Sequence, residues 1–127
     1  MLDLKSKLDP VQSLAPAAYT DSTDGTGVDL RGYNSAVVHI DVGLWTDGTH
    51  TFQVEDSADD TTFAAVADAN LQGAEPVVDG ATDDNQLYEI GYLGGKRYLR
   101  VAVTCATTTT GAVYSAVIHR GDKEDKS

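Results

Sequence analysis

A basic cluster that follows two glycines is the first group in this sequence that could carry chemistry. Lys96, Arg97 and Arg100 come directly after Gly94-Gly95, and positions 32 through 95 contain neither lysine nor arginine. A glycine-rich loop with a lysine suggests a phosphate cradle, but a P-loop needs four residues between its first glycine and Gly-Lys-Ser/Thr, and then a helix. Here the glycine spacing is one residue short, and an arginine and a strand pattern follow. The cluster favours a turn into a strand, whose arginines pair with carboxylates of this chain or of a neighbouring subunit.

An aspartate-rich turn is the second candidate. Asp56, Asp59 and Asp60 lie close together in "DSADDTT" and supply several oxygen ligands of the kind that Ca²⁺ prefers. The turn lacks the central glycine and the trailing glutamate of an EF-hand loop. A hairpin turn explains the same residues equally well, so calcium at these three aspartates stays a weak prediction.

The remaining reactive side chains are widely separated in the sequence. His39, His50 and His119 could meet only through the fold, whereas metal sites favour closely spaced ligands, so each is predicted to be a satisfied or exposed strand histidine. Cys105 is the single cysteine, which excludes an intrachain disulfide and favours a small apolar core residue. Neither a Gly-x-Ser-x-Gly motif nor a cysteine close to a histidine in sequence is present. We therefore predict that the protein is not an enzyme and uses no cofactor.

Composition narrows the classes of partner. The chain has 127 residues and a formal net charge of −11, with a sequence pI of about 4.3. A field of this sign repels phosphate backbones, which disfavours nucleic acid and anionic membranes as partners. No segment approaches the roughly 18 apolar residues of a membrane span, and the first ten residues lack the apolar region of a secretion signal. Synthesis in a cytoplasm without export is the expectation.

Alternation of apolar and polar side chains predicts the strands that position these groups. Every second residue is apolar in residues 35–43, 49–56 and 97–104, which places one side of each strand in a core. Residues 111–119 are apolar at both parities, which is typical of a strand buried on both faces. Weaker strand patterns occupy residues 16–20, 27–30, 62–66, 75–78 and 86–92.

These short strands are separated by Asp-Gly, Asp-Asp and Gly-Gly pairs, which suit tight turns. About eight such strands predict one all-β domain, either an antiparallel β-sandwich of jelly-roll-like type or a barrel. The helix-like residues 64–73 are too few to change this class. We predict an extended N-terminal arm over residues 1–14, a β-sandwich domain over 15–120 and a charged C-terminal tail over 121–127.

Two stretches are candidates for contact with other proteins. The arm combines apolar and basic side chains, and the cluster after the glycine pair adds three more cations; together they are Leu2, Leu4, Lys5, Lys7, Leu8, Lys96, Arg97 and Arg100. Tyr88, Tyr92 and Tyr98 could instead stack on a sugar if they were exposed, although a core or interface role is favoured for them.

Several longer stretches resemble a family of small structural proteins of tailed phages and prophages, which are encoded among head genes near the major capsid protein. The resemblance runs from Leu2 to about Asp122, and its most specific pieces are "VDLRGYNSA", "DSADDTTF" and "GGKRYLRV". It implies a head decoration (cement) protein in the virion, bound to the outer surface of the capsid. The implied partners are the major capsid protein and further copies of the chain, a trimer being favoured.

An alternative resemblance concerns the turn at residues 57–63. "SADDTTF" is similar to the Ser-x-Asp-Gly-x-x-Phe/Trp hairpin of discoidin-like, sugar-binding jelly rolls, although Asp60 stands where those proteins have glycine. A neck, tail or fibre component, or a carbohydrate-binding β-sandwich module, therefore remains the alternative to a decoration protein.

Overall fold

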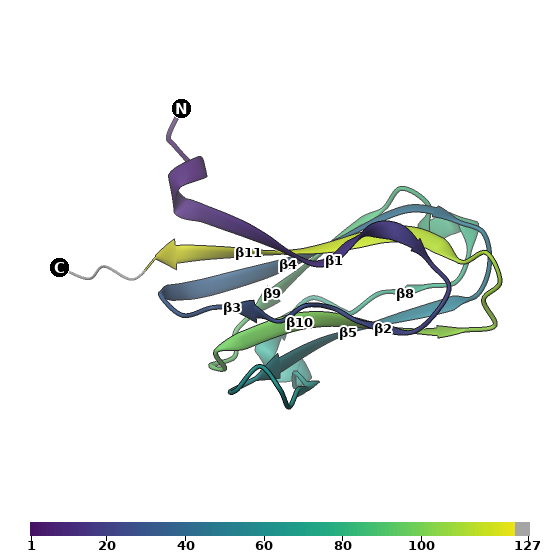
Figure 1. Ribbon diagram of the computed structural model, residues 1–127. Coiled ribbons are helices and arrows are strands. Elements are labelled where there is room, and N and C mark those ends of the chain that lie inside the picture. Colours follow the sequence, from purple (N-terminus) through teal and green to yellow (C-terminus); the bar gives the residue numbers. More distant parts are fainter. Residues whose placement is uncertain (124–127) are drawn as a thin grey trace.

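Two antiparallel β-sheets packed face to face make up the protein (Figure 1). The structure is a computed structural model that describes residues 1–123. Its only helical pieces in that range are three short 3₁₀ turns, η1 (Lys5–Lys7), η2 (Asp68–Asn70) and η3 (Ala81–Asp83). The predicted all-β class is confirmed, in the form of a sandwich and not a closed barrel.

Six of the eleven strands in residues 1–123 are long and five contain only two residues. The long strands are β1 (Leu8–Tyr19), β4 (Tyr33–Trp45), β5 (Thr49–Ser57), β9 (Leu87–Tyr92), β10 (Tyr98–Ala106) and β11 (Ala112–Lys123). The two-residue strands are β2 (Thr23–Asp24), β3 (Val28–Asp29), β6 (Ala64–Ala65), β7 (Leu71–Gln72) and β8 (Val77–Val78). The sequence pattern indicated three of these five, β3, β6 and β8, and missed β2 and β7.

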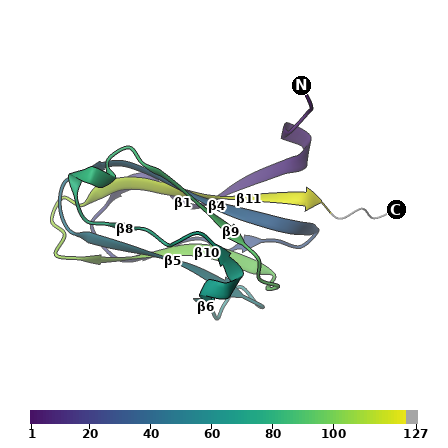
Figure 2. The same cartoon turned by 180° about the vertical axis from the view of Figure 1, so that it is seen from behind.

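Each sheet is built around long strands that lie side by side. One sheet has the order β1-β11-β4-β9-β7, and the other has the order β2-β10-β5-β6, with β3 added to β10 and β8 added to β5. Figure 2 shows β5, β6 and β8 of the second sheet from behind. β1 pairs with β11, so the first and the last strand lie side by side in the same sheet, and β4 joins β11 to β9.

The core forms where the alternating residues predict it. Val38 and Ile40 of β4 and Val54 of β5 are fully buried, as are Leu99 and Val101 of β10. Burial of both faces of residues 111–119, however, is wrong. Ala116 and Ile118 of β11 face the core, whereas Val113 on the opposite face is 42% exposed. The physical reason is that the second sheet covers only one face of the five-stranded sheet.

The predicted boundaries of the arm and of the tail also need correction. Residues 8–14 belong to β1 and pair with β11, and Leu14 is a core residue with 2% of its surface exposed. Residues 121–123 complete β11, because Gly121 lies opposite Leu8 and the two strands satisfy each other's backbone groups. Only residues 1–7 precede the sandwich, and residues 124–127 of the predicted tail lie outside the described part of the chain.

The strand directions divide the sandwich into two ends. The terminal end carries residues 1–7, the 30–32 turn, the 58–63 turn, the 93–97 loop and the end of β11 at Lys123 (Figure 1). The distal end carries the turns at 20–22, 46–48, 79–86 and 107–111. The basic candidates of the sequence analysis all lie at or near the terminal end.

Candidate functional site

The two ends of the sandwich differ sharply in charge. Eight of the nine lysines and arginines lie in the described residues, and all eight belong to the terminal end or to the halves of β10 and β11 nearest to it: Lys5, Lys7, Arg31, Lys96, Arg97, Arg100, Arg120 and Lys123. The turns of the distal end contain no lysine or arginine and carry Asp21, Asp47, Asp79, Asp83 and Asp84. Acidic side chains lie at both ends, including Asp3, Asp59 and Asp60 at the terminal end, so the feature that folding concentrates at one end is the set of cations.

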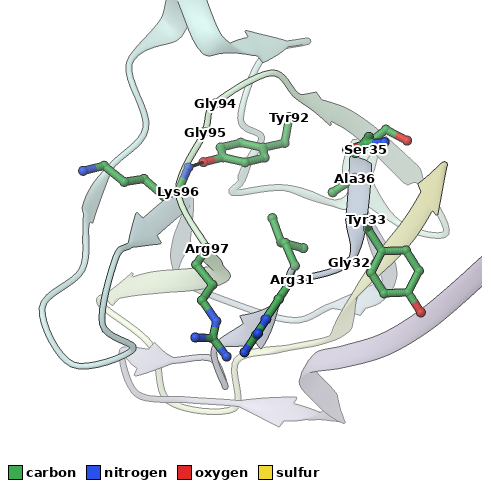
Figure 3. Close-up of a pocket in the computed structure, with 12 residues that line it drawn as sticks. Arg31, Gly32, Tyr33, Ser35, Ala36, Tyr92, Gly94, Gly95, Lys96 and Arg97 are labelled. Atoms are coloured by element: carbon green, nitrogen blue, oxygen red, sulfur yellow. Dashed lines mark hydrogen bonds between the residues drawn. The ribbon is translucent and has the colours of Figure 1, made fainter. Parts of the chain in front are cut away.

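A cavity opens at the terminal end between two segments that are far apart in the sequence. Its volume is about 470 Å³, and its walls are residues 30–36 and residues 92–97. These walls contain "LRGYNSA" and "GGKR", parts of two of the motifs on which the family resemblance rests. We call this cavity the basic pocket; Figure 3 shows Arg31, Lys96 and Arg97 around it.

Tyr92 anchors the loop that forms one wall of the basic pocket. Its hydroxyl donates to the Asp56 carboxylate at 2.8 Å and accepts the backbone N–H of Lys96 at 3.1 Å. Burial, reinforced by the hydrogen bond to Asp56, raises the pKa of Tyr92 to about 12, so the phenol stays neutral and remains a donor. The Gly94-Gly95 turn is thus fixed from inside the sandwich.

Arg97 ties the two walls together. Its Nε and Nη2 donate to the two carboxylate oxygens of Asp29 at 2.9 and 2.8 Å, a bidentate pair. The hydrogen bonds from Arg97 hold the pKa of Asp29 at about 2, well below its usual value of 3.8. The same carboxylate accepts the backbone N–H of Arg31 at 3.0 Å, which fixes the facing turn.

The side chains of Arg31 and Lys96 differ from that of Arg97 in having no carboxylate partner among the described residues. Within residues 1–123 neither of them forms an ion pair, whereas Arg97, Arg100 and Arg120 each pair with a carboxylate. In Figure 3 the guanidinium groups of Arg31 and Arg97 point the same way, while Lys96 extends away from the cavity. The rim of the pocket therefore offers positive charge that the described part of the chain does not neutralise by direct contact.

A smaller basic cavity adjoins this end. Its volume is about 180 Å³, and Lys5, Lys7 and Lys123 line it together with Asp9 and Tyr33. Tyr33 also lines the basic pocket, so the two cavities lie next to each other. Cations from η1, β11, the 30–32 turn and the 93–97 loop thus gather on one end of the molecule.

Of the predicted contact residues, some take part in internal contacts and others remain on the surface. Arg100 pairs with Glu55 at 2.7 Å and lies over the ring of Phe63, which confirms the predicted pairing with carboxylates for this residue and for Arg97. Leu2 and Leu4 are 92% and 63% exposed, and Leu8 is exposed at the start of β1. Sequence reasoning missed Arg31 as a partner of the 96–97 cluster, because nothing in the sequence says that the two turns meet.

The three aspartates of the weak calcium candidate are not gathered into one cluster. Asp56 accepts the Tyr92 hydroxyl, and Asp59 caps its own turn by accepting the backbone N–H groups of Thr61 and Thr62 at 3.0 Å each. In residues 1–123 no group of three or more histidine, cysteine or acidic side chains could hold a metal ion. Asp59 is thus a turn-forming residue, as the hairpin interpretation predicts, whereas Asp56 lies in β5 and holds Tyr92.

The histidines form two separate contacts. His39 lies 2.6 Å from Glu89 and packs edge-on against His119 on the outer face of the five-stranded sheet. His50 is fully buried near the distal end, with Nδ1 2.9 Å from the Tyr114 hydroxyl. The sequence could not show that Cys105, half-buried against the core, lies 3.2 Å from His50, because the pairing of their strands was unknown.

The fold and the pocket define an all-β domain with a basic pocket at the end that carries both the N-terminus and Lys123. No protein-family model matches the chain, and no curated protein matches it. The resemblance to phage head proteins therefore depends on the motifs quoted above. No helix in residues 1–123 is long and apolar enough to span a membrane.

Proposed function

We propose that this protein is a structural protein of a tailed-phage virion that attaches to the outer surface of the capsid and stabilises the head. The observation that carries the proposal is the terminal end itself, where exposed apolar side chains of residues 1–7 stand beside a cluster of cations on an otherwise acidic body. The major capsid protein is the proposed partner, and self-association on the capsid, with a trimer favoured, is part of the same proposal.

Residues 1–7 have the character of a contact segment. Leu2 and Leu4 expose most of their surface, and Lys5 and Lys7 alternate with polar residues in η1. Exposed apolar side chains grouped with cations are a common feature of protein interaction sites. In Figure 1 this segment projects from the sandwich at the terminal end, where a shell could receive it.

The lining of the basic pocket supports attachment and not catalysis. Residues 30–36 and 92–97 contain no histidine, cysteine, aspartate or glutamate. General acid–base or nucleophilic chemistry usually depends on such side chains within hydrogen-bonding reach of a substrate. The pocket offers cations, two tyrosines, an asparagine, a serine and backbone groups, which suit binding.

The tyrosines give less support to a sugar-binding module. Tyr92 belongs to the core and borders the basic pocket with only 6% of its surface exposed, while Tyr88 and Tyr98 are half-buried. A sugar platform needs an exposed aromatic face. We therefore favour attachment to the head over the carbohydrate-binding alternative. Imaging of the particle distinguishes the head from a location in the neck or tail.

Cosedimentation with capsids that lack this protein tests the proposal. We expect the full chain to bind near stoichiometrically and a chain without residues 1–7 to bind about tenfold more weakly, because it loses the exposed leucines and two cations. The truncation stops short of Leu8, so β1 keeps its pairing with β11. Leu2→Ser/Leu4→Ser serves as a full-length control for the apolar part of the segment.

Two results would count against the proposal in different ways. Absence of binding by the full chain would reject the attachment to the head and return a neck, tail or fibre role to the front. Undiminished binding by the truncated chain would remove residues 1–7 from the contact while leaving attachment intact.

A further inference from the structure

We propose that the basic pocket binds a carboxylate-bearing, acidic segment of the partner protein, with Arg31 as the main contact and Lys96 at the rim. The inference rests on the proposed function, because it names the chemistry of the surface to which the terminal end attaches. The basic pocket itself is lined by residues outside 1–7 and is tested separately from them, although Lys5 and Lys7 line the neighbouring cavity.

Among the cations that line the basic pocket, Arg31 and Lys96 are selected because neither has a carboxylate partner within residues 1–123. Arg97 is neutralised by its bidentate pair with Asp29, and Arg100 and Arg120 are paired with Glu55 and Asp9. The side chains of Arg31 and Lys96 make no hydrogen bond or ion pair within residues 1–123; only their backbone N–H groups do so. Cations held by a fixed backbone but without a carboxylate partner are suited to accept one from another molecule.

The pocket also has the size and rigidity of a binding site. A volume of about 470 Å³ lies in the range of small-ligand pockets, roughly 300–1,000 Å³. Both walls are held by hydrogen bonds, Tyr92 to Asp56 on one side and Arg97 to Asp29 on the other. A preformed site loses little conformational entropy on binding.

The lining combines charge with apolar surface. Leu30, Ala36 and the ring of Tyr92 line the cavity beside the cations. The planar guanidinium of Arg31 can hold a carboxylate with two parallel hydrogen bonds. A glutamate or aspartate side chain matches this lining, since its carboxylate meets the arginine and its methylene groups meet the apolar surface.

The neighbouring lysine cavity extends the site beyond one carboxylate. Lys5, Lys7 and Lys123 line this cavity, which shares Tyr33 with the basic pocket. An extended chain advances roughly 3.3 Å per residue, so a few residues span adjacent cavities. The expected ligand is therefore a short segment with more than one acidic residue.

Protein is favoured over nucleic acid as the source of the negative charge. Duplex DNA carries one charge per roughly 1.7 Å, and the net charge of −11 would repel it along most of its length. A short acidic segment places its few charges only at the terminal end. The five aspartates of the distal end stay far from it and disfavour other approaches of an anionic partner.

The direct test uses the full 127-residue chain and a penta-glutamate peptide as the probe, followed by NMR chemical-shift mapping. We expect shifts concentrated in residues 30–36 and 92–97, with an affinity that falls as ionic strength rises. Arg31→Gln/Lys96→Gln should weaken binding about tenfold, because the Arg31 contact and the positive charge of Lys96 at the rim are lost. The matched control is Gln12→Glu/Gln86→Glu, which changes net charge equally at exposed positions outside the pocket.

The outcomes separate the alternatives. Shifts spread over the surface, or equal binding by Arg31→Gln/Lys96→Gln, would overturn the site. If a short oligothymidine binds more tightly than the peptide, the pocket is assigned to nucleic acid. If the wild type sediments as a larger species and Arg31→Gln/Lys96→Gln dissociates it, the pocket is assigned to the distal end of a second copy. Both results reject the inference as stated.

Capsid cosedimentation distinguishes the failure of this inference from the failure of the proposed function. If the peptide binds the pocket but the full chain does not bind capsids, the acidic-ligand site stands and the decoration role fails. If capsids bind Arg31→Gln/Lys96→Gln as well as the wild type, the role stands and the site is not the contact.

Discussion

Asp29 shows how one carboxylate can organise a site without being part of its binding surface. It accepts two hydrogen bonds from Arg97 and one from the backbone of Arg31, and so joins the two walls of the basic pocket. The side chains of Asp29 and Arg97 are 41% and 44% exposed, so solvent screens the pair. The pair therefore serves mainly to position the two walls and adds little to the free energy of unfolding.

The lowered pKa of Asp29 gives a testable pH dependence. A carboxyl group whose pKa falls from 3.8 to about 2 on folding contributes stability above pH 3.8, and this contribution is lost as pH falls through about 2. We expect Asp29→Asn to lower the free energy of unfolding by about 0.5–1 kcal/mol at pH 7, with a smaller difference at low pH. Urea unfolding at several pH values measures it.

Asp21→Asn is the control for this substitution, because the Asp21 carboxylate makes no ion pair or side-chain hydrogen bond within residues 1–123. If Asp29→Asn and the wild type kept the same difference in stability from pH 7 to pH 2, the pair with Arg97 would not be the origin of the effect.

At the scale of elements, β1 is joined to the other sheet by Ser13. The Ser13 hydroxyl accepts the backbone N–H of Val101 in β10 and donates to the carbonyl of Thr26, both at 3.0 Å. The segment between β2 and β3 passes close to Ser13 and Val101, and the backbone N–H of Gly25 donates to the Val101 carbonyl at 2.8 Å. A Cβ at Gly25 would collide with Ser13 and with Val101, so glycine is required there by close approach.

Ser13 therefore contributes to stability beyond its size. Ser13→Ala leaves the Val101 N–H buried without this acceptor, and we expect it to lower the free energy of unfolding by about 1–3 kcal/mol. Ser35→Ala, at an exposed position of β4, should cost less than about 0.5 kcal/mol. Thermal or denaturant unfolding compares the two; equal costs would show that Ser13 does not join the sheets.

At the scale of the whole molecule, the polarity of charge sets an orientation. Every lysine and arginine in residues 1–123 lies at the terminal end or in the strand halves next to it, and the distal turns carry aspartates without lysine or arginine. If the protein attaches as proposed, the distal end should point away from the shell, since its charge gives no complementary contact there. Image reconstruction of decorated particles should show the N-terminus and the basic pocket against the capsid. Density with the distal turns on the shell would contradict this orientation.

Much of the fold was predictable from local pattern. The period of two in residues 35–43, 49–56 and 97–104 depends only on strand geometry, and the buried residues fall at the predicted parity. The extent of β1 was not predictable, because Leu8–Leu14 is a strand only through its pairing with β11, more than 100 residues later in the chain. The same applies to the outer face of β11, whose exposure depends on which sheet covers it.

The candidate site divides in the same way. The sequence by itself determined the acidic net charge and the turn before Lys96, because composition and short-range geometry decide these. It predicted that Arg97 and Arg100 pair with carboxylates, but their partners Asp29 and Glu55 are distant in the sequence and were set by the fold. Only the tertiary structure decided that the 30–36 and 92–97 segments meet, that the cations gather at one end, and that Asp56 accepts the hydroxyl of Tyr92. Such contacts depend on strand order and register, and no local pattern of residues encodes which distant strands become neighbours.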